Sequence, residues 1–162
     1  MDVRNPAVIG NFDSLPVGDG GHWTTKAALA IRWEWRADGR LGWLSEELRI
    51  PAGYRWDGAS RPDFVGWLIP RGGVFLLASL VHDYCFKERP LLLGDPRQPP
   101  SRISRQHTDM LFLALMRMLA AERVHTGWKA RAQVVMASVM WRAVRWFGEP
   151  VWDAHDKEYR GS

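Results

Sequence analysis

The sequence predicts an α+β fold, with a small N-terminal antiparallel sheet followed by three packed helices. Hydrophobic residues alternate with a period of two in the first third of the chain, and from residue 74 onward they recur at helical spacing. Proline and glycine mark the points where the segments change. A length of 162 residues suits one domain with a single core. We assign this domain to residues 1–148 and a polar C-terminal tail to residues 149–162.

The N-terminal part of the chain predicts few strands. Residues 1–22 are rich in Gly, Pro, Asp and Asn, so we expect a loop with one short strand at residues 7–12. The first strong strand signal is the alternation in residues 29–35. It places four apolar side chains on one face: Leu29, Ile31, Trp33 and Trp35.

A hairpin is expected after that strand. Asp-Gly at the centre of residues 37–40 is a strong turn signal. Residues 47–56 predict the returning strand, and Pro51 either keeps this strand at a sheet edge or ends it, because proline donates no ladder hydrogen bond. We therefore expect a sheet of about three strands.

Three helices are expected in the second half. The first begins after Gly73 and stops before Pro90, and the proline-rich stretch that follows predicts a connecting loop. Ser104 is a suitable N-cap for the second helix. Gly127 separates the second helix from the third, an amphipathic helix that ends at Gly148.

Composition narrows the possible partners. The net charge is only +4 and no long run of like charges occurs, so we expect no nucleic-acid partner. Ten tryptophans, several beside arginine, favour contact with other proteins. No N-terminal signal peptide is recognisable, and the apolar stretches are too short to span a bilayer, so we expect any membrane or cell-envelope contact to be peripheral.

An ionisable pair interrupts the apolar run "LVHDYCF", where His82 and Asp83 are adjacent. On the next helix, Asp109 shares a face with apolar residues, and we expect it to point inward, away from Arg105 and Arg117. A buried carboxylate needs a partner, and His82 is the obvious candidate. This pairing would fix the tautomer of His82 and make it a better general base.

Asp83 is then available for a different role. With Asp57 and backbone carbonyls of the stretch "YRWDGASRPDFVGW", it could hold a hard cation such as Ca²⁺. A histidine base that activates water, together with a metal that stabilises an oxyanion, makes a complete hydrolytic scheme.

The same residues also have a structural interpretation. His82 and Asp109 could simply hold two helices together, and Asp83 could be a solvated or capping carboxylate. Cys85, the only cysteine, is expected to be a buried structural thiol. His107 lies two positions from Asp109 on another face of its helix, so we expect it to be exposed.

Several motifs resemble a known family. The motifs "IPAGYRWDGASRP", "LASLVHDYCF" and "SRQHTDMLFLALMRML", followed by "WRAVRWFG", resemble the phage and prophage family of unknown function numbered 1353. The resemblance covers roughly residues 22–148. It implies phage origin and other phage proteins as partners, and it favours an enzyme and a virion-incorporated protein equally. The single cysteine fits synthesis in a reducing bacterial cytoplasm.

A second resemblance concerns chemistry. "HDYCF" followed by an aspartate on the next helix is similar to the active-site pattern of calcium-dependent secreted phospholipases A₂. The resemblance implies that His82 activates water, Asp83 binds calcium and Asp109 orients His82.

Two functional hypotheses follow. The first is a metal-dependent hydrolase of phage origin, acting on a lipid ester or, as a second choice, on a cell-envelope polymer. The second is a non-enzymatic virion or tail-associated structural protein that docks partners through its Trp/Arg-rich surface.

Overall fold

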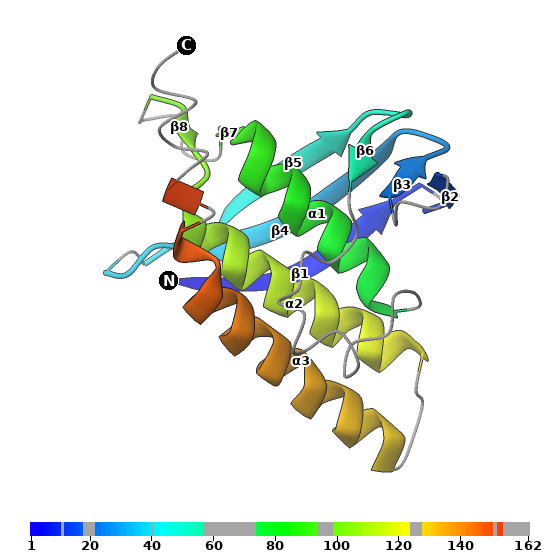
Figure 1. The fold of residues 1–162 in the computed structure, drawn as a ribbon. Coiled ribbons are helices and arrows are strands. Elements are labelled where there is room, and N and C mark those ends of the chain that lie inside the picture. The colour runs from blue at the N-terminus through cyan, green and yellow to red at the C-terminus, as the bar shows by residue number, and fades with distance from the viewer. Residues whose placement is uncertain are drawn as a thin grey trace.

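The computed structural model confirms the α+β fold, with antiparallel sheets followed by three helices (Figure 1). The structure describes residues 1–10, 12–17, 22–39, 41–56, 74–93, 99–123, 128–150 and 152–153.

The main sheet has the strand order β1-β4-β5, all antiparallel. These strands are β1 (Asp2–Ile9), β4 (Leu29–Arg36) and β5 (Leu44–Ile50). Ile31 lies opposite Val8 on one side and Leu48 on the other. The predicted inward face of β4 is confirmed, since Leu29, Ile31 and Trp33 are buried and Trp35 is partly buried.

The prediction for the N-terminus was wrong. Where a loop with one short strand was expected, the described residues form β1, β2 (Ser14–Val17) and β3 (His22–Thr25). The reason is that β1 is an edge strand held by non-local pairing with β4, and Asn5-Pro6 in its middle is typical of a turn. A register shift between Arg4 and Ala7 accommodates Pro6, and Asn5 takes a positive φ of 48° there.

The segment 47–56 is not one strand. β5 ends at Ile50, and β6 (Arg55–Trp56) belongs to a second sheet of order β2-β3-β6. Pro51 therefore ends the strand, as one of the two alternatives anticipated. Gly53 makes the change of direction with φ of 77° and donates its N–H to the carbonyl of Thr25.

The helices begin and end close to their expected residues. They are α1 (Val74–Glu88), α2 (Arg105–Arg123) and α3 (Trp128–Phe147). Ser104 caps α2, because its Oγ accepts the backbone N–H of His107 at 3.1 Å. The expected loop between α1 and α2 contains a two-stranded ribbon, β7 (Leu91–Leu92) with β8 (Ser101–Arg102).

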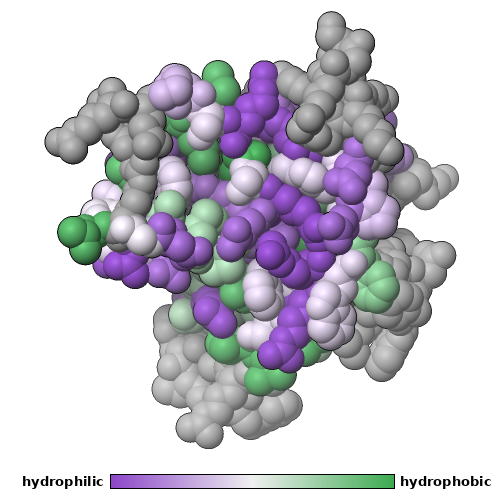
Figure 2. Space-filling view, turned by 90° about the vertical axis from the view of Figure 1, so that its left-hand side faces the viewer, coloured by the Kyte–Doolittle hydropathy of each residue, from purple (hydrophilic) through white to green (hydrophobic). Residues whose placement is uncertain are grey.

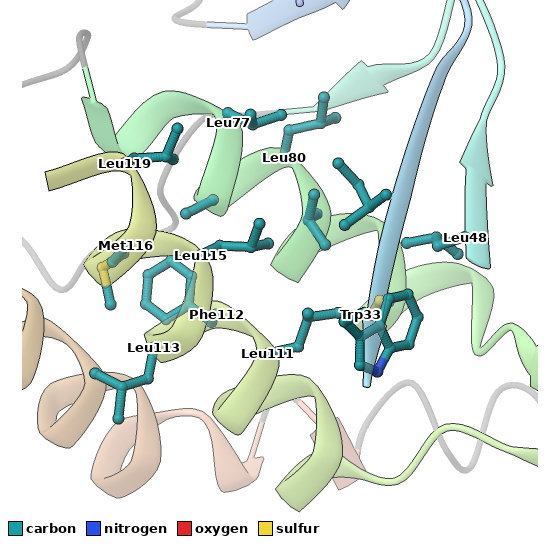
Figure 3. Packing of buried hydrophobic residues seen from close by; sticks show 14 of the residues in the cluster. Trp33, Leu48, Leu77, Leu80, Leu111, Phe112, Leu113, Leu115, Met116 and Leu119 are labelled. Carbon is teal, nitrogen blue, oxygen red and sulfur yellow. The ribbon is translucent and has the colours of Figure 1, made fainter. Parts of the chain in front are cut away.

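The elements are arranged in layers. α1 and α2 lie over the main sheet, and α3 lies outermost against α2 (Figure 1). Figure 3 shows the core between the first two layers, where Trp33 and Leu48 of the sheet face apolar side chains of α1 and α2. The C-terminal end of α1, the N-terminal end of α2 and the C-terminal end of α3 lie at the same end of the molecule, on the left in Figure 1. In the described part of the chain, no helix is long and apolar enough to cross a membrane.

Candidate functional site

His82 and Asp109 meet between α1 and α2, as the sequence predicted. The Nε2 atom of His82 lies 3.3 Å from Oδ1 of Asp109. The Asp109 side chain is fully buried, whereas the His82 side chain retains 15% of its exposure. The pair therefore combines a carboxylate shielded from water with an imidazole that solvent can still reach.

Two aromatic rings hold the imidazole of His82 in place. Phe86 lies one turn further along α1, with ring centroids 4.2 Å apart, and Phe112 of α2 lies 4.9 Å away. A carboxylate only accepts hydrogen bonds, so the neutral imidazole must carry its proton on Nε2 to donate to Asp109. This tautomer leaves Nδ1 with the lone pair that a general base uses.

Arginine side chains occupy the other oxygen of Asp109. Arg145, near the end of α3, donates from Nη1 to Oδ2 at 3.3 Å. Nε of Arg105, one turn before Asp109 on α2, lies 3.9 Å from the same oxygen. Arg105 also donates to the carbonyl of Arg145 and lies 3.6 Å from Glu149. The buried charge of Asp109 is thus compensated by two cations, and the cluster joins all three helices.

The expectation that Arg105 points away from Asp109 was wrong. Residues four apart on a helix are neighbours, and a long arginine side chain can reach back along the surface to a buried carboxylate. Arg145 was not predicted from the sequence as a site residue. A usable signal existed, because a basic residue near the end of α3 could reach an inward-facing aspartate on the helix packed against it.

Asp83 points to a different neighbourhood. Its Oδ2 accepts a hydrogen bond from Nζ of Lys87 at 2.9 Å, one turn along α1. Burial, and after it the charge of Asp83, raises the pKa of Tyr54, which lies beside β6. Adjacent residues of α1 therefore serve separate contacts, His82 with Asp109 and Asp83 with Lys87.

The described residues do not assemble a calcium site. No group of three or more His, Cys, Asp or Glu side chains that could hold a metal occurs among them. Asp57, together with the rest of the predicted metal loop, falls outside the described residues. Calcium binding by Asp83 and Asp57 accordingly stays a prediction.

His107 is buried, so the expectation that it is exposed was wrong. Its Nε2 accepts a hydrogen bond of 2.9 Å from Nε1 of Trp33, and its ring also contacts Trp35. Burial lowers the pKa of His107 to about 4. The first turn of α2 lies against the inward face of β4, so this neutral histidine joins the helix to the sheet.

Cys85 is a buried thiol, as expected. It is part of the core cluster, and burial raises its pKa above the ordinary range. A thiol held protonated in an apolar environment is a poor nucleophile and a poor metal ligand.

The chain just after α3 packs against Phe86, the ring that contacts His82. The ring of Trp152 packs edge-on against Phe86, with centroids 4.8 Å apart. The guanidinium of Arg89 lies over the same indole and donates to the carbonyl of Trp152 at 2.8 Å. Trp152 falls within the stretch assigned to the tail, and the division at residue 148 stays a prediction.

Figure 2 views this end of the helices, where hydrophilic residues gather across the middle of the face.

These features define an α+β protein whose three helices share a buried aspartate held by a histidine and two arginines. The chain belongs to the family described as Protein of unknown function (DUF1353), whose model matches residues 33–144, more than half of the sequence. The matched range contains His82, Asp83 and Asp109 and ends just before Arg145. No curated protein and no solved structure matches the chain.

Proposed function

We propose that His82 and Asp109 form the general-base pair of a hydrolase encoded by a phage or prophage. The observation that carries this proposal is the contact between Nε2 of a partly exposed histidine and a fully buried carboxylate. A histidine that only filled the core would be fully buried, whereas the His82 side chain retains 15% of its exposure. The resemblance to secreted phospholipases A₂ supports a lipid ester as the first substrate, with a cell-envelope polymer as the second.

The chemistry assigned to each residue follows from the tautomer. Nδ1 of His82 would take a proton from water as the water oxygen attacks the ester carbonyl. Asp109 would hold the ring and stabilise the imidazolium that forms, and the alcohol would leave with that proton. Arg145 and Arg105 lie beside Asp109 and would compensate its negative charge while the ring is held.

Hydrolysis of short-chain phosphatidylglycerol by the full chain tests the proposal. We expect His82→Gln to lower kcat by about 100-fold or more, because glutamine cannot accept the proton. His22→Gln changes an exposed histidine of β3 and is the matched control. Circular dichroism of each variant separates lost chemistry from lost folding. Equal rates for wild type and His82→Gln, or no hydrolysis by wild type, would contradict the proposal.

Calcium is tested separately in the same assay. If Asp83 and Asp57 hold the ion, calcium raises the wild-type rate, and Asp83→Asn removes that response but leaves the chain folded. If calcium changes neither the rate nor the thermal stability, the metal part of the proposal fails, and the His82–Asp109 pair can still be judged by the rate of His82→Gln.

One observation favours the second candidate, a structural protein of the virion or tail. The cluster around Asp109 joins α1, α2 and α3, which is what a fold-holding network does. On this hypothesis Asp109→Asn lowers the free energy of unfolding by about 3 kcal/mol in urea. Asp13→Asn, which alters an exposed ion pair with Lys26, costs less than about 1 kcal/mol. Detection of the chain in purified phage particles without hydrolytic activity would favour this candidate over the first.

A further inference from the structure

The outward side of α3 is unusually apolar for a solvent-facing surface. Among the described residues, nine large hydrophobic side chains are exposed, and five of them lie on this one helix. These five are Val134, Val135, Val139, Trp146 and Phe147. Three of them, Val135, Val139 and Trp146, share one side of the helix, which we call the α3 face. Single exposed apolar residues are common, but a group on one helix indicates a contact surface.

Helical spacing makes the α3 face continuous. Val135, Val139, Arg142 and Trp146 follow one another at steps of four, three and four residues, so they form one stripe along the helix. The opposite side of α3 is already occupied, because Ala137 and Met140 are buried in the contact with α2. α3 is the outermost layer of the molecule, so the stripe faces outward along the helix (Figure 1).

The charge of α3 indicates which kind of surface the stripe contacts. α3 carries no acidic residue, and the exposed Arg142 lies within the stripe. Glu149, the first acidic residue after α3, lies 3.6 Å from Arg105, so its charge is partly compensated. An anionic surface would meet both the apolar stripe and the positive charge.

We propose that α3 docks the protein peripherally on an anionic lipid surface. A helix flank with Val and Trp and no acidic residue is suited to the boundary between headgroups and acyl chains, where Trp is favoured. A protein partner would need a concave surface shaped to the stripe, whereas lipid adapts to it. Val135, Val139 and Trp146 enter the boundary, and Arg142 attracts the anionic headgroups. The proposal does not rest on hydrolysis by the His82–Asp109 pair.

Co-sedimentation of the full chain with vesicles tests this docking. Vesicles of phosphatidylglycerol mixed with phosphatidylcholine should bind the chain, and vesicles of phosphatidylcholine alone should bind it about tenfold more weakly. Val139→Asp should weaken binding to the anionic vesicles by about tenfold or more, and Trp146→Ala should weaken it in the same direction. Leu41→Asp makes the same change of charge at a fully exposed apolar residue of the β4–β5 connection and is the matched control.

Three results would overturn the proposal. The first is no binding to the anionic vesicles, and the second is equal binding by Val139→Asp and Leu41→Asp. The third is a concentration-dependent dimer that Val139→Asp abolishes, which would assign the α3 face to a second copy of the chain. Circular dichroism of the variants excludes loss of folding as the cause of lost binding.

Discussion

His82 and Asp83 are neighbours in the sequence with separate partners in the structure. Successive residues of a helix point about 100° apart, so the two side chains of the pair can reach different neighbours. His82 contacts Asp109, and Asp83 binds Lys87. The adjacency of an imidazole and a carboxylate is therefore no evidence that they act on the same atom, and the base and the metal ligand need separate tests.

The burial of His107 can be tested by the pH dependence of stability. The folded pKa is about 4, whereas an unfolded histidine titrates near 6.5. Between these values the unfolded chain binds a proton that the folded chain does not, so stability falls as the pH drops from about 6.5 to 4. The contribution of His107 is about 3 kcal/mol over that window. Urea unfolding at a series of pH values measures it.

His107→Gln supplies the comparison for that measurement. The amide oxygen of glutamine can accept the hydrogen bond from Nε1 of Trp33, but the side chain does not titrate. Wild type should therefore lose unfolding free energy between pH 6.5 and 4, whereas the variant loses none from this position. Any advantage of wild type over the variant at pH 7 should decrease as the pH falls. A difference that stays constant from pH 7 to 4.5 would show that the histidine does not hold its depressed pKa.

At the scale of elements, the helices were easier to predict than the strands. Gly73, Pro90 and Ser104 mark helix ends by backbone chemistry that acts locally. β1 could not be recognised because its pairing with β4 is non-local and Asn5-Pro6 in its middle is typical of a turn. For the same reason nothing in residues 47–56 revealed that β5 and β6 pair with different sheets.

Ser104→Ala tests the start of α2. Removing the Oγ that accepts the N–H of His107 should lower the free energy of unfolding by about 1 kcal/mol. Ser138→Ala is a suitable control, because the Ser138 hydroxyl donates to a carbonyl on the exposed side of α3 and caps no helix start. Chemical denaturation of both variants should separate them, and equal losses would argue against the cap.

At the scale of the whole molecule, one core joins the sheets to α1 and α2, and the site is built into its edge. The sequence predicted half of that site. An aspartate on an apolar helix face implied a partner, and His82 was the nearest candidate. Arg105 and Arg145 could not be assigned, since which long cation reaches a buried carboxylate depends on how the ends of three helices meet. Asp57 stays untested, because it falls outside the described residues.

Cys85 reports on the integrity of this core. The thiol is fully buried among residues of the core cluster, so it should react with a thiol reagent only when the chain opens. We expect the native protein to react with dithionitrobenzoate about 100-fold more slowly than the urea-unfolded chain. Reaction at the unfolded rate under native conditions would mean that α1 does not pack as described.

The central claim is that Asp109 holds His82 with Nδ1 available as a base. Nitrogen-15 NMR of the histidine rings tests it most directly, with the His82 signals identified by their loss in His82→Gln. We predict that neutral His82 carries its proton on Nε2, that Nδ1 has the chemical shift of an unprotonated ring nitrogen, and that Asp109→Asn alters this pattern. A neutral His82 protonated on Nδ1, or a tautomer unaffected by Asp109→Asn, would contradict the claim.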